Sequence, residues 1–377
     1  MKTNKKKVDL RSYMMIIALL VIWLIFTIMT KGSFLSARNI SNLFRQSVFI
    51  SLLAIGMVMV IILGEIDLSV GSIVGLSGGI LAILDVWKGI NPVLSMIITL
   101  GIGLLLGLWN GYWIAYKGVP SFIVTLGGML IFRGILMGIT KGITIGPMSH
   151  FFTFLGKGYL SNSFGILLGI IASIMIIISE FRSWKKKKSY NIDSSSTRFE
   201  FVKVALYIIL INLFVIIFNS YNGLPFPLLI MIIILLLFAY ITQNTVFGRY
   251  IYAIGGNSKA AILSGINIKK ITLIVFMING LLASLGGVFL TSRLNAAAVS
   301  AGEGAELDTI AACVIGGASL MGGIGTTFGA VVGAIVMTSL DNGMSLLNVE
   351  VFWQSIIKGL VLLFAVWFDV ISKKREA

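Results

Sequence analysis

Long apolar runs recur along the whole chain. Stretches of about 16 to 23 apolar residues alternate with short polar segments, and a helix needs about 20 such residues to cross the hydrocarbon core of a bilayer. Hydrophobic residues make up 58% of the sequence and charged residues only 11%. A soluble protein of this size would need more polar surface. The pattern therefore predicts an all-α, polytopic helical membrane protein.

We expect about twelve spans, with about 10 to 12 compatible with the pattern, in a single transmembrane domain over residues 1–377. The N-terminal apolar run is longer than that of a typical signal peptide, so it is interpreted as an uncleaved first span. The expected spans are 13–30, 46–63, 70–86, 93–115, 119–138, 164–181, 204–219, 226–243, 271–290, 308–322, 326–340 and 354–371.

Basic residues indicate the sidedness of these spans. If the N-terminus is cytosolic, the inside segments carry 20 of the 29 Lys and Arg residues, as the positive-inside rule expects. This predicts that both termini, 182–203 and 244–270 are cytosolic, while 139–163 and 341–353 lie outside. Because the net charge of +15 lies largely in such loops, we expect no nucleic-acid partner.

The basic loop 182–203 is interpreted as a stop-transfer cluster, with lipid binding as the alternative.

Two acids interrupt the apolar sequence GEIDLSVGSIVGLSGG at residues 64–79. A charge in the membrane core is costly, so Glu65 and Asp67 should face a cavity, a partner or an interface. Asp67 and Ser69 stand directly before an apolar helix, where their side chains can cap its free N–H groups. We expect Glu65, Asp67 and Ser69 to form a helix break and cap. A proton relay through the two acids, as in an ion-coupled secondary transporter, is the alternative.

Glycines recur at every fourth position in three apolar segments. In lipid, small residues at this spacing let two helix backbones approach closely. The series predict tight helix packing at Gly71, Gly75 and Gly79, at Gly103, Gly107 and Gly111, and at Gly325, Gly329 and Gly333.

Catalytic residue sets do not stand out. The acids Glu303, Glu306 and Asp308 precede an apolar segment, where the positive end of a helix favours them. The later GGASLMGGIG lacks the Lys-Ser/Thr of a phosphate-binding loop. Only one histidine, His150, and one cysteine, Cys313, occur, too few for a metal site or His-based catalysis. We expect a non-catalytic chain that holds no metal or cofactor.

Four segments together resemble the permease subunits of bacterial ABC importers for ribose, galactose, arabinose and xylose. They are GEIDLSVGSIVGLSGG, VPSFIVTLGGMLIFRG (119–134), FGRYIYAIGGNSKAAILSGIN (247–267) and ELDTIAACVIGGASLMGGIGT (306–326). The likeness covers nearly the whole chain in order. It is strongest to the xylose-type members, because of LGLWNGYWIAYKGVPSFIVTLGGML and the extra pair of spans around 182–203.

The resemblance implies a homodimeric permease in the cell inner membrane that carries a monosaccharide, most specifically a pentose such as xylose. It also implies a cytosolic ATPase with two nucleotide-binding cassettes, which binds the ATP, and an extracytoplasmic sugar-binding protein. A genomic neighbour with tandem Walker motifs would distinguish this function from secondary transport.

The same resemblance assigns 244–270 as the loop that couples to the ATPase. Its KAAILSG resembles the E-A-A-x-x-x-G pattern of ABC importers, with Lys259 where relatives often carry Glu. Ser258 can cap a short helix over 259–264, Gly265 can end it in a left-handed turn, and Ala260 and Ala261 can seat it in a groove of the ATPase. We expect apolar side chains here, including Tyr250, Ile251, Leu263 and Ile266, to need a partner. The predicted coupling residues are Gly256, Asn257, Ser258, Lys259, Ala260, Ala261 and Gly265.

Overall fold

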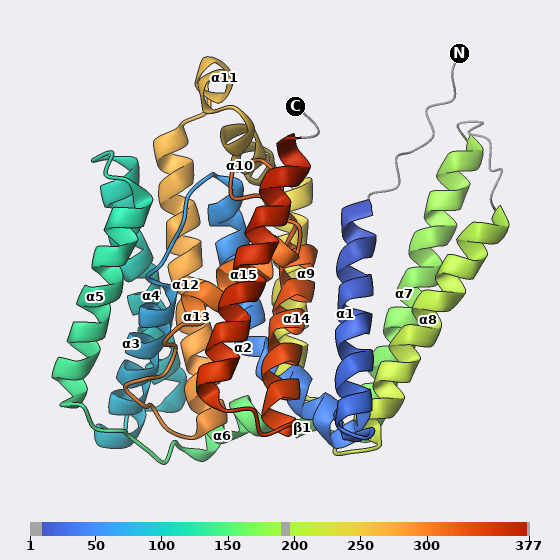
Figure 1. The fold of residues 1–377 in the computed structure, drawn as a ribbon, viewed down its shortest axis with the longest axis horizontal. Coiled ribbons are helices and arrows are strands. Elements are labelled where there is room, and N and C mark those ends of the chain that lie inside the picture. Colours follow the sequence, from blue (N-terminus) through green and yellow to red (C-terminus); the bar gives the residue numbers. More distant parts are fainter. Residues whose placement is uncertain (1–9, 190–196, 375–377) are drawn as a thin grey trace.

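The computed structural model describes residues 10–189 and 197–374, which form a bundle of helices (Figure 1). The elements are α1 (Leu10–Met29), the 3₁₀ turn η1 (Ser33–Leu35), α2 (Ala37–Ile62), α3 (Val70–Ala82), its π-helical continuation η2 (Ile83–Trp87), α4 (Pro92–Ala115), α5 (Ser121–Thr140), α6 (His150–Lys157), β1 (Tyr159–Leu160), α7 (Asn162–Ser189), α8 (Thr197–Asn219), β2 (Leu224–Pro225), α9 (Phe226–Asn244), α10 (Val246–Gly256), α11 (Ser258–Leu263), α12 (Ile268–Leu294), α13 (Ala305–Ile315), α14 (Thr327–Leu346) and α15 (Val351–Lys374).

The predicted all-α membrane architecture is confirmed. Within the described residues, nine helices are long and apolar enough to cross a bilayer, and α1 and α8 contain shorter apolar stretches. The start of α1, the end of α15, α10 and α11 lie at one end of the bundle, whereas α6 and β1 lie at the other (Figure 1). Segments predicted to share one side of the membrane therefore share one end of the structure.

The centre of the bundle is α2, and 83% of its most apolar window is buried. It is packed by α12, α14 and α9. The outer helices α4, α5 and α15 instead present exposed apolar side chains such as Leu130, Trp113 and Leu363. In a bilayer such faces contact lipid, because acyl chains solvate them as well as a protein core does. Burial thus separates the helices that form the core from those that face the membrane.

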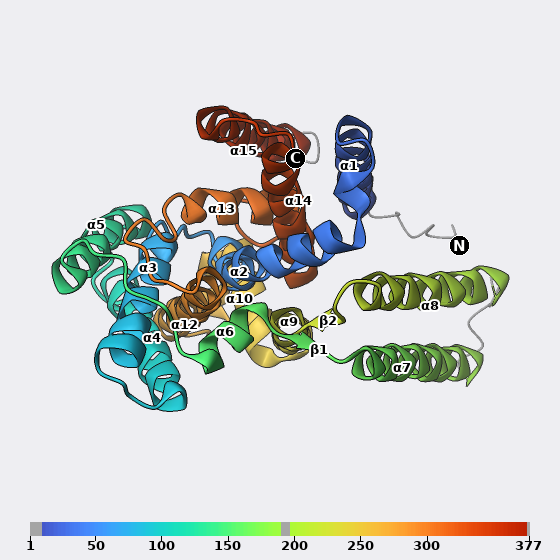
Figure 2. The same cartoon turned by 90° about the horizontal axis from the view of Figure 1, so that it is seen from below.

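One expected span is wrong. The segment 308–322 does not form a continuous membrane helix, since α13 has only 11 residues and is therefore about 16 Å long, half the hydrocarbon thickness. Figure 2 shows α13 lengthwise across the bundle, whereas α12 is seen nearly end-on. The glycines at 302 and 304 before it and at 316 and 317 after it interrupt the helical pattern. The chain therefore returns from the end of α12 to the start of α14 through one short helix, α13, between two irregular segments.

The basic segment 182–203 is also more regular than expected. Helix α7 continues to Ser189 and α8 begins at Thr197, so most of this predicted loop is helical; residues 190–196 lie outside the described part. The two helices pack on each other and extend away from the bundle (Figure 2). At their base, β1 and β2 pair antiparallel, and the rings of Phe214 and Phe218 pack edge-on against Phe44 of α2.

Candidate translocation and coupling site

The predicted helix break is present between α2 and α3. Residues 63–69 are not helical, and Gly64 adopts φ +84°, a left-handed conformation that favours glycine. The chain turns back into the bundle after α2, so that α3 begins inside it (Figure 1). Asn279, which contacts this segment, lies 11 residues after the start of α12, a depth of about 16 Å. The break therefore starts at the end of the bundle with residues 63–65 and reaches toward the middle of the membrane at Asp67.

Asp67 is the centre of a buried hydrogen-bond network. It is 1% exposed. One of its carboxylate oxygens, Oδ1, accepts from the backbone N–H of Ser69 at 2.8 Å and from its hydroxyl at 2.6 Å. The other, Oδ2, accepts from the amide of Asn279 at 2.8 Å, and the amide of Asn110 donates to the Ser69 hydroxyl at 2.8 Å. The network ties the start of α3 to α4 and α12, because a buried polar group must find partners.

The predicted cap on α3 is wrong in its details. No side chain caps the helix, although Ser69 stands at the N-cap position. The backbone of Ser69 is already helical, with φ −86° and ψ −11°, and its hydroxyl donates back to Asp67. Glu65 does not join this network. It lines a pocket at the end of the bundle instead, so the two acids have separate surroundings.

The predicted coupling loop folds into α10 and α11 at that same end (Figure 1). Helix α11 starts at Ser258 and is capped by Asn257, whose side chain accepts from the N–H of Ala260 at 3.0 Å. The prediction that Ser258 caps the helix is therefore wrong by one residue. Gly265 does end the turn with φ +78°, as expected for a left-handed helix terminus.

Burial corrects which side chains of this loop face outward. Ile251 and Ala261, expected to face a partner, are 1% and 3% exposed, because α10 and α11 turn one face toward their own bundle. The outward side chains are Ile262 at 60% and Leu263 at 90% exposure, together with Ser258, Lys259 and Ala260. Ile262 and Leu263 thus form a small apolar tip of α11 at this end of the bundle.

Helix α10 is joined to the end of α2 through backbone contacts. The N–H of Gly323 donates to the carbonyl of Ile62 at 2.8 Å. A Cβ atom on Gly255 would collide with that same carbonyl and lie 2.7 Å from the nitrogen of Gly323. The hydroxyl of Tyr252 donates to the carbonyl of Gly325 at 2.7 Å. Gly323 and Gly325 belong to the connection between α13 and α14, so α10 contacts α2 directly at Gly255 and is held to this connection by Tyr252.

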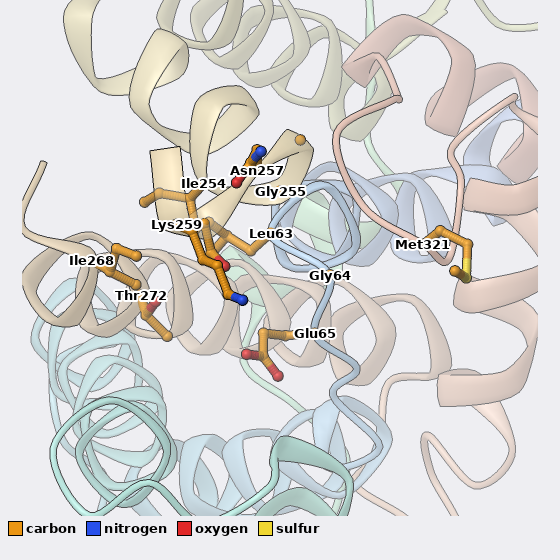
Figure 3. Close-up of a pocket in the computed structure, with 12 residues that line it drawn as sticks. Leu63, Gly64, Glu65, Ile254, Gly255, Asn257, Lys259, Ile268, Thr272 and Met321 are labelled. Atoms are coloured by element: carbon orange, nitrogen blue, oxygen red, sulfur yellow. The ribbon is translucent and has the colours of Figure 1, made fainter. Parts of the chain in front are cut away.

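A pocket of about 490 Å³ lies between the loop and the break. Leu63, Gly64 and Glu65 form one wall, and residues 254–259 with Ile268 and Thr272 form the other. Figure 3 shows the side chains of Glu65 and Lys259 pointing toward one another across it. The junction therefore brings opposite charges to the two sides of a water-accessible gap.

Comparison with known proteins identifies the family of this chain. A family profile described as "Branched-chain amino acid transport system / permease component" matches residues 39–366, most of the chain. The chain belongs to this permease family. It is thus a membrane-embedded transport subunit and not an enzyme, and the resemblance inferred from its motifs is confirmed.

Named relatives agree with the family. The permease is 50% identical to the xylose transport system permease protein XylH of Haemophilus influenzae over 98% of its own length and 99% of the relative's. It is 50% identical to XylH of Escherichia coli K12, with 98% and 94% covered. The ribose import permease protein RbsC of Bacillus subtilis is 34% identical, with 95% and 92% covered. No solved structure matches the chain with statistical significance.

The glycine series of the permease lie mostly where helices touch. A Cβ atom on Gly103 would come within 2.7 Å of the Gly280 carbonyl, and one on Gly107 within 2.9 Å of the Met277 Cα, so α4 and α12 meet backbone to backbone. Gly71, Gly75 and Gly79 face residues 301–306 and Leu136 of α5, and Gly329 and Gly333 face Gly316 and Ala312. Gly325 departs from the prediction, since it precedes α14 and lies in a loop.

Two residues of the Asp67 network were missed in the sequence. Asn110 and Asn279 are both fully buried, and each is followed by glycine within an apolar run, in WNGY and INGL. An asparagine followed by glycine inside an apolar run can predict a buried hydrogen-bonding position. The amide must find a partner within the membrane, and the glycine lets that partner approach.

Proposed function

We propose that this chain is the permease subunit of an ATP-driven importer for a pentose, specifically xylose. The observation that carries the proposal is the 50% identity to xylose permeases over 98% of this chain. Two copies of the chain form the route through the inner membrane, and a separate extracytoplasmic protein delivers the sugar.

The ATPase docks on α10 and α11. Leu263 and Ile262 project from this end of the bundle, and their exposure to water is unfavourable unless a partner buries them. The coupling set Gly256, Asn257, Ser258, Lys259, Ala260 and Gly265 surrounds these two side chains. Movement of the docked ATPase reaches α2 and the helix break through the contacts of Gly255 and Gly323. ATP is bound by the partner, and this chain needs no cofactor.

The end that carries α10 and α11 faces the cytosol, together with both termini. The basic residues in 182–203 and 244–270 support this orientation, because Lys and Arg are retained on the cytosolic side during insertion. The binding protein then meets the opposite end, where α6 and the 141–149 and 347–350 connections lie (Figure 1).

Transport by a reconstituted complex tests the proposal. The permease, its ATPase and its binding protein are assembled in proteoliposomes, and uptake of radiolabelled xylose, ribose, galactose and arabinose is compared with ATP inside and then without it. We expect ATP-dependent uptake with xylose preferred. Uptake that follows an ion gradient without ATP, or a preference for another sugar, would reject the corresponding part of the proposal.

A further inference from the structure

Five charged side chains form a band on one face of the bundle, away from α11 and beside the first turns of α3. They come from four helices: Arg133 of α5, Glu306 and Asp308 of α13, Asp341 of α14 and Lys358 of α15. We call these five residues the charged band. None of them has a role in the docking surface described above.

Direct contacts link the members of the charged band. The ammonium of Lys358 donates to Asp308 at 2.9 Å and lies 3.5 Å from Asp341. Glu306 lies within electrostatic range of both Arg133 and Asp308. Arg133 also donates to the carbonyls of Val299, at 2.5 Å, and Ala301, at 3.1 Å. The band therefore runs from α5 along the start of α13 to α15.

The band lies inside the membrane. Arg133 is seven residues before the end of α5, and Lys358 is seven residues after the start of α15. At 1.5 Å per residue both are about 10 Å inside the end of the bundle opposite α11. Asp341, five residues before the end of α14, is about 8 Å inside that end. Arg133, Lys358 and Asp341 thus lie at about one level in the outer half of the bilayer, and Glu306 lies deeper, against Gly71 of α3.

The band is also partly exposed. The side chains of Lys358, Asp308 and Asp341 are 25%, 14% and 34% accessible. Neighbouring positions on the same helices, such as Ile135 of α5 and Leu360 of α15, are exposed and apolar, as suits contact with lipid. Lipid cannot solvate partly exposed carboxylates at this depth, so charged groups in membrane helices normally face protein or a water-filled cavity.

We propose that the charged band lines the aqueous route of the sugar in the outer half of the membrane. This assignment rests on the proposed function and names the residues along the route. A neutral pentose carries hydroxyl groups that both donate and accept hydrogen bonds. Carboxylates accept from these hydroxyls, and the Arg133 and Lys358 side chains donate to them. Gly71 and Gly75 lack side chains, which lets the Glu306 carboxylate and the Arg133 guanidinium pack closely against α3.

Cysteine labelling tests the route. In a Cys313→Ser chain, which removes the sole native thiol, cysteine replaces Glu306 in one variant and the exposed neighbour Glu303 in a second. The matched control is Ile135→Cys, on the lipid-exposed side of α5. An impermeant, water-soluble maleimide is added to the assembled complex, with copurified ATPase as the check that each variant is folded.

We expect rapid labelling at Glu306→Cys and Glu303→Cys, slow labelling at Ile135→Cys, and protection of the first by xylose when the binding protein delivers it. In separate transport assays, Glu306→Gln is expected to raise the KM for xylose uptake about fivefold, because a neutral amide accepts a hydrogen bond more weakly than a carboxylate does, while Ile135→Val leaves it unchanged. Absence of labelling at Glu306→Cys while the exposed Glu303→Cys reacts, or labelling at Glu306→Cys that xylose does not change, would overturn the assignment. Failure of the unmodified complex to import any pentose would instead reject the proposed function.

Discussion

At the scale of single residues, the permease uses an acid in its interior to fix structure. Asp67 accepts three hydrogen bonds from two partners, so its carboxylate is matched to donors on α12 and on its own segment. A proton relay would need a chain of titratable neighbours, whereas the direct partners of Asp67 are a serine and an asparagine. This arrangement favours a structural role over the ion-coupled alternative.

Exchanging the acid and the amide between positions 67 and 279 tests that structural role. In Asp67→Asn, one of the two carboxylate oxygens is replaced by an NH2 group, so at least one of the three hydrogen bonds that Asp67 accepts is lost or rearranged. We expect a loss of about 1–3 kcal/mol in the free energy of unfolding, measured by thermal denaturation of the purified permease. Adding Asn279→Asp restores a donor–acceptor pair and should recover part of that loss.

Glu65→Gln provides the control for this pair. Its side chain lines the pocket of Figure 3 and lies outside the Asp67 network, so its melting temperature should stay close to that of the unmodified chain. An equal loss in Glu65→Gln and Asp67→Asn would contradict the proposed network.

At the scale of elements, α10 and α11 combine a buried face, which fixes them to the bundle, with an exposed tip. This division explains why Ala261 is a poor site for testing the ATPase contact. A large residue there would overfill this chain's own interior. The informative positions are those whose side chains leave the bundle.

Leu263→Asp is expected to remove the ATPase contact without unfolding the permease, because a 90% exposed side chain has little packing to lose within the chain. Retention of the ATPase by the affinity-purified permease measures the effect. The control is Val351→Asp, an apolar side chain 76% exposed at the opposite end of the bundle. If both variants retain the ATPase equally, α11 is not the docking element.

Substitutions at the adjacent glycines Gly255 and Gly256 distinguish binding of the ATPase from transmission of its movement to α2. Gly255→Ala places a methyl group against the Ile62 carbonyl, whereas Gly256 has no atom within 4 Å of an added Cβ. We expect Gly255→Ala to keep the ATPase bound but to lower sugar uptake per ATP hydrolysed, since the α10–α2 junction must shift. Gly256→Ala should transport normally. Normal coupling in both variants would show that this junction does not transmit movement.

At the scale of the whole molecule, the bundle has two chemically different ends. One end carries α10 and α11, and the other carries α6 and the short β1–β2 pair (Figures 1 and 2). Leu263 of α11 is 90% exposed at the first of these ends. Transport in one direction requires this asymmetry, because the ATPase and the sugar-delivering protein must meet different surfaces.

Labelling of intact cells checks the orientation. On the Cys313→Ser background, Ser264→Cys near the exposed tip of α11 should resist an impermeant thiol reagent until the membrane is broken. Ser345→Cys, exposed at the far end of α14, should react from outside. Reaction of Ser264→Cys in sealed cells would reverse the assigned topology.

Local sequence patterns determined the helices and their packing partners to a large extent. Apolar length defined most spans, and the acids with the following glycine series located the break before α3, because each depends on residues close together in the chain. Motif resemblance over the full length identified the transport family. The tight α4 packing was likewise visible in the spacing of Gly103, Gly107 and Gly111.

Only the tertiary structure decided which side chains meet across the bundle. The pairing of Asp67 with Asn279 joins positions more than two hundred residues apart. Arg133 donates to the Val299 carbonyl, 166 residues further along the sequence. The inward face of α11, the short length of α13 and the helical course of 182–189 also escaped prediction. Burial and long-range hydrogen bonding depend on how helices are arranged around α2, and no local pattern of hydrophobicity or charge encodes that arrangement.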